Sequence, residues 1–178
     1  MAISRAEYEA AVARTLEYFE KACIALTEEE KAGVEVAEFG LGELEKTGLE
    51  IVTYVNTKRC CAKELVLFPG QTCPEHRHPN DGIIPGKEET FRCRWGEVWL
   101  YVAGMPTANI KGTPPGEFYS VFHEVILKPG EQYTLEPNTL HWFQGGPEGA
   151  VVSEFSTMST DEADFFTDPR IQRAPEVY

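Results

Sequence analysis

Apolar side chains recur at spacings of three and four along the first 30 residues, which is the period of an α-helix with one buried face. Ser4 is followed three residues later by Glu7, a capping-box pattern, and Thr27 with Glu30 repeats it before a short second helix. The stripe of the first helix consists of Tyr8, Ala11, Val12, Leu16, Phe19 and Cys23. The pattern predicts a helical preface over residues 1–33.

From Leu49 onward the pattern changes to short runs rich in Val, Tyr, Phe and Trp, separated by glycine and proline turns. Residues 34–47, before these runs, are expected to form a short extended piece and turns. Two segments, 79–87 and 104–116, are expected to be long loops. The expected strands are 49–56, 60–68, 71–78, 89–95, 97–102, 118–127, 132–135, 141–144 and 150–156, and the clearest turns are 69–70, 129–130 and 145–147.

Eight or nine short strands after a helical preface predict an all-β architecture, a closed double-sheet barrel of the jelly-roll kind. At 178 residues the chain is long enough to bury a core as one domain over 1–178. The barrel is expected to span 49–156. The polar tail over 157–178 is expected to form a short helix followed by an arm, and is called the C-terminal arm below.

Charge and cysteine usage restrict the partners and the compartment. Acidic residues outnumber basic ones by 29 to 16, so a net charge of −13 repels nucleic acid and anionic membranes, and no basic cluster offers a phosphate site. No apolar run approaches the roughly 18 residues of a membrane span, and the N-terminus leads into an amphipathic helix rather than a signal peptide. The odd cysteine set (Cys23, Cys60, Cys61, Cys73 and Cys93) lacks Cys-x-x-Cys spacing and indicates packed thiols. We therefore expect a cytoplasmic protein with no nucleic-acid or membrane partner.

His76 and His78 are separated by one residue within an expected strand. Positions i and i+2 of a strand project to the same face, so both imidazoles can reach one metal ion. Surface strands also carry such pairs, so the pair alone does not define a metal site.

Glu89 lies in residues 88–95, a run that includes the expected strand 89–95 and whose side chains alternate between two faces. The polar face consists of Glu88, Thr90, Arg92 and Arg94, and the apolar face carries Glu89, Phe91, Cys93 and Trp95. The alternation turns Glu89 rather than Glu88 toward the core, where a buried carboxylate needs a partner such as a metal ion. His141 shares a face with Phe143 and is also expected to point inward. On its own, His141 is better explained as a core histidine bonded to a backbone carbonyl.

These residues resemble the motifs of the cupins, a family of metal-binding β-barrels. The first cupin motif reads Gly, five residues, His-x-His, a gap, Glu, six residues, Gly, and this chain matches it with Gly70, His76, His78, Glu89 and Gly96. Residues 130–141 resemble the second motif, which ends in a histidine after a tight turn. The resemblance implies a double-stranded β-helix in which His76, His78, Glu89 and His141 hold one divalent metal ion.

The chain departs from the cupin pattern at four places. The gap between His78 and Glu89 holds ten residues, so the loop there carries an insertion. Pro137 lies one residue later than the proline of the family, Asn138 stands where the family has glycine, and Gly145 replaces an asparagine. Asparagine is the next most tolerant residue of a left-handed backbone, so Asn138 is expected to preserve the turn.

The wider sequence resembles one group of cupins, the D-lyxose isomerases. The resemblance covers residues 36–42, 54–57, 63–76, 87–91, 141–144 and 154–157. It implies an aldose–ketose isomerase that interconverts D-lyxose with D-xylulose, and also D-mannose with D-fructose, through an enediol. In that reading Glu154 is the base, Lys63 binds or polarises sugar oxygens, and Glu89 shares in proton transfer. The shell suits Mn, Fe, Co, Ni or Zn; we expect Mn²⁺, with Co²⁺ or another transition metal as alternatives.

Several alternatives follow from the same residues. The metal shell equally suits an Fe(II)-dependent dioxygenase. A non-catalytic sugar-binding cupin gives no reason for Lys63 and Glu154 to flank the metal. The alternative for these two residues is a place on the outer face of the sheet. A phosphosugar isomerase is disfavoured because no phosphate site is evident.

The other candidate residues have weaker assignments. Trp142 and Gln144 are candidates for the pocket mouth or for rim packing, and His123 for a structural role. Arg170 and Arg173 are candidates for anchoring the arm. Since cupin sheets often pair through one face, we also expect a homodimer.

Overall fold

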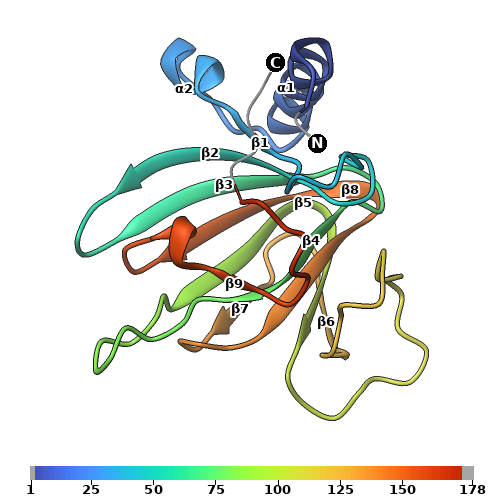
Figure 1. Ribbon diagram of the computed structural model, residues 1–178. Helices are drawn as coiled ribbons and strands as arrows, with labels where there is room; N and C mark the ends of the chain where they lie inside the picture. Colours follow the sequence, from blue (N-terminus) through green and yellow to red (C-terminus); the bar gives the residue numbers. More distant parts are fainter. Residues whose placement is uncertain (1–2, 174–178) are drawn as a thin grey trace.

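The computed structural model describes residues 3–173, and it confirms both predicted helices (Figure 1). Helix α1 spans Arg5–Lys21 and α2 spans Glu28–Ala32. Both begin with complete capping boxes: the hydroxyls of Ser4 and Thr27 accept from the backbone N–H three residues later, and the glutamate there accepts from the cap backbone. Among the described residues, no helix is long and apolar enough to cross a membrane.

The rest of the described chain is mainly β-sheet, which confirms the all-β prediction. Its strands are β1 (Glu35–Ala37), β2 (Leu49–Asn56), β3 (Cys61–Leu67), β4 (Thr72–Arg77), β5 (Glu89–Val102), β6 (His123–Leu127), β7 (Gln132–Leu135), β8 (His141–Ser156) and β9 (Phe165–Phe166). They pair in the order β1-β2-β3-β8-β4-β9, and β5 pairs with β6, β7 and β8. One half of β8 pairs with β3 and the other half with β4, so the sheet curls into a barrel with two faces (Figure 1).

Two pairs of predicted strands are each one continuous strand, β5 and β8. The predicted turn over 145–147 is therefore wrong, and the predicted strand over 118–127 begins only at His123. Gly96 interrupts the apolar pattern of β5 without ending the strand. It lies in a bulged region with φ of +70°, and a Cβ there would lie 2.1 Å from the carbonyl oxygen of Gly149. Glycine thus allows the two long strands to approach and bend together.

Side chains of β3 alternate between two apolar cores. Leu65 and Leu67 lie in the barrel interior, whereas Val66, together with Phe68 just beyond the strand, lies in a second cluster beneath α1. Both faces of β3 are therefore buried, one by the opposite face of the barrel and the other by the helical preface.

Trp95 packs against the second cluster, where its ring meets Tyr18 edge-on at a centroid distance of 5.4 Å. Its predicted place on the inner face beside Glu89 is wrong. A register shift between Cys93 and Trp95 changes the alternation there, and strict alternation from the sequence does not include such a shift.

The described part of the C-terminal arm covers 157–173. The predicted short helix is a single 3-10 turn at Asp161–Ala163, followed by β9 along the edge of β4, with Phe166 opposite His76. The pairing brings the arm across the barrel beside the strand that carries the histidine pair. The predicted ends of the preface and the arm, 1–2 and 174–178, lie outside the described residues.

Glu50 on β2 is a buried carboxyl group remote from the histidines. Its side chain is fully buried; Oε1 accepts from the Gln71 amide at 3.1 Å, and Oε2 has no hydrogen-bond partner among the described residues. Burial raises the pKa of Glu50 to about 8. The folded chain thus favours the neutral carboxyl, whereas an unfolded chain ionises near its ordinary pKa of 4.5.

Glu50→Gln is expected to stabilise the protein in a pH-dependent way. Wild-type stability falls as pH rises from about 4.5 to about 8, because the folded state resists losing this proton, and glutamine has no proton to lose. The melting temperature of the variant should exceed that of wild type by roughly 5–10 °C at pH 8.5 and by little at pH 5. Thermal unfolding between pH 5 and 9 checks this, with Glu45→Gln as an exposed control. A difference that does not change with pH would contradict the assignment.

Candidate active site

Three histidines converge inside the barrel. His76 lies near the end of β4, His78 just beyond that strand, and His141 begins β8 directly opposite His76 in the register. One ring nitrogen of each lies within 4.8 Å of the others, and all three side chains are buried. The strand spacing therefore places both members of the histidine pair on one face, as predicted.

Each imidazole is held through Nδ1. In His76 and His141, Nδ1 lies 2.8 and 2.9 Å from the carbonyl oxygen two residues earlier, and a carbonyl can only accept, so Nδ1 carries the proton. Nδ1 of His78 lies 2.5 Å from Oδ1 of Asp164. In His76 and His141 this leaves an unprotonated Nε2, which is the tautomer of a metal-bound histidine. Nε2 of His78 also points at the cluster and lies 3.1 Å from Oε1 of Glu89.

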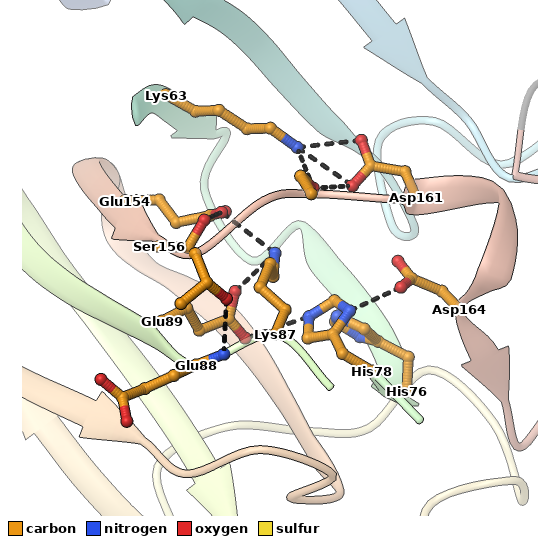
Figure 2. A network of polar contacts seen from close by, with 12 residues as sticks. Lys63, His76, His78, Lys87, Glu88, Glu89, Glu154, Ser156, Asp161 and Asp164 are labelled. Carbon is orange, nitrogen blue, oxygen red and sulfur yellow. Dashed lines mark hydrogen bonds and ion pairs between the residues drawn. The ribbon is translucent and has the colours of Figure 1, made fainter. Parts of the chain in front are cut away.

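Glu89 completes the cluster from the first position of β5. It is 2% exposed, whereas Glu88 is exposed and points away, which confirms the predicted alternation (Figure 2). Oε1 of Glu89 lies 3.1 Å from Nε2 of His78 and 3.1 Å from Nε2 of His141. Nε2 of His141 is buried and has no hydrogen-bond partner among the described residues. An orphaned imidazole nitrogen beside a buried carboxylate fits a divalent cation.

The charges of the cluster are strongly coupled. Burial works to raise the pKa of Glu89, but Lys87 and His78 hold it well below its usual range. Burial and the two other imidazoles lower the pKa of His76, which keeps this ring neutral. Burial opposes ionisation of His78 too, but Glu89 and the Asp164 hydrogen bond raise its pKa to about 9. Metal binding at His78 must therefore displace a proton.

Lys63 and Glu154 face each other across β3 and β8. Both side chains are buried and line the cavity described below, so the alternative that placed them on the outer face of the barrel is wrong. Nζ of Lys63 donates to both carboxylate oxygens of Asp161, at 2.9 and 3.1 Å (Figure 2). Burial works to raise the pKa of Asp161, but Lys63 holds it below its usual range.

Lys87 connects the histidine cluster to Glu154. Its Nζ lies 2.7 Å from Oε2 of Glu89 and donates to Oε1 of Glu154 at 3.0 Å (Figure 2). Burial works to lower the pKa of Lys87, but the carboxylates of Glu154 and Glu89 raise it above its usual range. The ammonium therefore places Glu154 next to the cluster.

Lys87 was not among the predicted site residues, because it falls at the end of the expected long loop over 79–87. A signal was available, since Lys87 precedes Glu89 by two residues and extended chain places both on one face. Asp161 and Asp164 were also missed, and there the sequence offers no signal, because neither lies in a periodic segment.

A cavity of about 40 Å³ lies among these side chains. Its wall is lined by Lys63, His76, His78, Lys87, Glu89, Glu154, Asp161, Asp164 and Arg173 on the polar side, and by residues such as Leu65, Phe91, Phe143 and Phe166 on the apolar side. Charged groups meeting in so small and partly apolar a space interact more strongly than they would in water.

The remaining candidate residues lie elsewhere. Trp142, Gln144 and His123 hydrogen-bond the backbone of the loop between β5 and β6, and this supports a packing role for each. Arg170 bonds Asp168 within the arm. Arg173 bonds Glu35 and Asp161, so it joins the arm to β1 as well as lining the cavity.

Taken together, the curled sheet and the cluster inside it define a cupin barrel with three histidines arranged as in a metal site. The fold is similar to that of L-ribose isomerase from Cellulomonas parahominis, with a TM-score of 0.77, 18% identity and 99% of each chain covered. L-ribose isomerase from Acinetobacter sp. DL28, in complex with L-ribose, gives a TM-score of 0.74 at 19% identity, covering 99% of this chain and 98% of that one.

Sequence relatives narrow the class to one family. A sequence model of D-lyxose isomerase matches residues 117–178. The chain is 64% identical over 167 residues to the D-lyxose/D-mannose isomerase of Thermosediminibacter oceani, covering 92% of each. It is 61% identical over 174 residues to the D-lyxose ketol-isomerase of Cohnella laeviribosi, covering 96% of each. The chain belongs to the D-lyxose isomerase family of sugar isomerases, as the sequence resemblance predicted.

Proposed function

We propose that the protein is a metal-dependent aldose–ketose isomerase that interconverts D-lyxose with D-xylulose, and D-mannose with D-fructose. The observation that carries the proposal is the ion-pair chain from Glu89 through Lys87 to Glu154, which joins a candidate base to the histidine cluster inside one cavity. A purely sugar-binding barrel would not need these buried charges, whose desolvation is costly.

His76, His78, Glu89 and His141 would hold one divalent ion, with Mn²⁺ as our expectation and Co²⁺ or another transition metal as alternatives. Their converging Nε2 atoms and the buried carboxylate support this assignment. When bound, the ion supplies a Lewis acid that polarises the sugar carbonyl and stabilises developing negative charge on oxygen.

Glu154 is the proposed base. Its carboxylate takes the proton from C2 of the aldose and returns it to C1 of the enediol, which gives the ketose. Lys63 donates hydrogen bonds to sugar oxygens from the strand opposite. Lys87 bonds both Glu154 and Glu89 and holds Glu154 beside the cluster. Glu89 shares in the transfer by moving the second proton from the C2 oxygen to the C1 oxygen.

The substrate range is tested by assaying the metal-loaded protein against a panel of free pentoses and hexoses. Ketose formation should be fastest with D-lyxose or D-mannose and should need no oxygen. A panel in which no aldose is converted would contradict the proposal. Turnover that consumes oxygen would also contradict it and would favour the dioxygenase alternative.

We also infer that the protein works in the cytoplasm. All five cysteines are free thiols, two of them exposed, as expected in a reducing compartment. Fusion of a fluorescent protein followed by imaging in the source cell checks the location, and an extracellular signal would contradict it.

A homodimer is the expected assembly. Val55, Ala62 and Phe155 are consecutive partners across β2, β3 and β8, and the two larger side chains are 40% and 50% exposed, which supports a second copy packing on this outer face. Light scattering at micromolar concentration should report twice the monomer mass. Phe155→Asp should shift the mass toward the monomer, and a wild-type monomer would contradict the expectation.

A further inference from the structure

The three histidines differ in what holds them. His76 and His141 bond carbonyls two residues earlier in their own strand segments, so their orientation is local. His78 has no such local anchor. Its Nδ1 instead meets a carboxylate oxygen of Asp164, which lies 86 residues further along the chain.

Asp164 is placed by the structure of the C-terminal arm. It caps the 3-10 turn, and its own N–H donates to the carbonyl of Asp161. The next residues form β9, and the backbone N–H of Thr167 donates to the carbonyl of Glu75 on β4 at 3.1 Å. The side chain of Asp164 is 8% exposed, so the contact with His78 is shielded from water. A short segment with several backbone anchors thus fixes this carboxylate.

The arm also packs on a second histidine. The ring of Phe166 stacks on the ring of His76 at a centroid distance of 5.4 Å and an interplanar angle of 30°. The arm therefore touches the cluster twice, once through a charged hydrogen bond and once through an aromatic face.

We propose that Asp164 is the positioning residue of the metal site: its carboxylate accepts from Nδ1–H of His78 and directs Nε2 toward the ion. The inference rests on the proposed metal centre and extends it to the arm, which becomes part of the site. A carboxylate behind a metal-bound imidazole fixes the tautomer, restrains ring rotation and increases the basicity of Nε2. A carbonyl does the first two and is weaker in the third, so His78 should be the strongest imidazole donor of the three.

The test compares Mn²⁺ affinity by calorimetry for wild type, Asp164→Asn, Asp164→Ala and the matched control Asp168→Asn. Asp168 lies in the same arm and bonds Arg170 rather than a histidine. The dissociation constant should rise roughly 10–100-fold in Asp164→Ala and less in Asp164→Asn, whose amide oxygen still accepts from Nδ1–H without a charge. Asp168→Asn should match wild type.

A spectroscopic reading separates positioning from general stability. In the Zn²⁺-loaded protein, Nδ1–H of His78 should give a far-downfield proton signal that moves in Asp164→Asn and disappears in Asp164→Ala. Wild-type-like affinity in Asp164→Ala, an equal loss in Asp168→Asn, or an unmoved signal would overturn the proposal. If hydrogen exchange at the Thr167 amide shows that alanine releases the arm, Asp164→Asn decides by the same two criteria.

The outcome is separable from that of the isomerase proposal, because sugar turnover is not the readout. A wild-type protein that binds Mn²⁺ but converts no sugar would contradict the proposed activity and leave the role of Asp164 standing. A wild-type protein that binds no divalent metal would overturn both.

Discussion

Replacement of Glu154 by glutamine is expected to lower turnover by roughly 10²–10⁴-fold, the usual effect of losing a general base. The amide keeps the size of the side chain, and its oxygen still accepts from Lys87, but it cannot take a proton. Metal content should stay at the wild-type level, because Glu154 is linked to the cluster through Lys87, which bonds Glu89, and is not itself one of the proposed ligands. Sugar affinity should change little if the carboxylate acts mainly in the transition state.

Glu64→Gln provides the matched control. Glu64 lies next to Lys63 on β3, is as buried as Glu154, and bonds Ser153, the residue before Glu154. Because neighbouring strand positions face opposite sides, Glu64 lies outside the cavity, and its variant should retain turnover. Steady-state kinetics and metal analysis of both variants check the prediction. Near-normal turnover in Glu154→Gln would remove this residue from the mechanism.

Removal of the metal is expected to abolish activity completely, and Mn²⁺ or Co²⁺ should restore it. The reason is that polarisation of the carbonyl and stabilisation of the developing oxyanion both depend on the ion. His141→Ala should also abolish activity, and added metal should not restore it. The substitution deletes a buried metal ligand whose Nε2 has no hydrogen-bond partner among the described residues.

His123→Ala is the control for the metal prediction, since His123 bonds the backbone of the neighbouring loop instead of joining the cluster. Activity of wild type, chelated and reloaded protein, together with metal content, checks the expected order. Full activity in protein shown to be free of metal would refute the metal-centre assignment, as would metal-loaded, active His141→Ala.

The elements that follow strict periodicity were predictable from the sequence. The helical stripe as far as Phe19 predicts α1, although Cys23, its last predicted member, is exposed and lies beyond the end of the helix. Alternation places Glu89 inside and Glu88 outside. The turn before His141 also forms as predicted. Asn138, which stands where the cupin pattern has glycine, adopts a left-handed backbone with φ of +63°.

Prediction failed where geometry departs from the simple period or where contacts are distant. Trp95 packs against the second cluster, beneath α1, because a register shift before it changes the alternation. Asp161 and Asp164 reach Lys63 and His78 across 98 and 86 residues, and no local pattern encodes such contacts. Lys87 was predictable, because the alternation of the strand that was expected to begin at Glu89 continues two residues earlier and places Lys87 on the same face as Glu89.

The most direct test of the account follows deuterium from C2 of D-lyxose during anaerobic turnover by the Mn²⁺-loaded protein. D-xylulose is expected to form without oxygen, and part of the label should pass into water, because Glu154 carries the proton between carbons and can exchange it. No ketose under these conditions would contradict the isomerase assignment. Ketose with the label wholly retained at C1 would indicate a hydride shift and contradict the proton transfer assigned to Glu154.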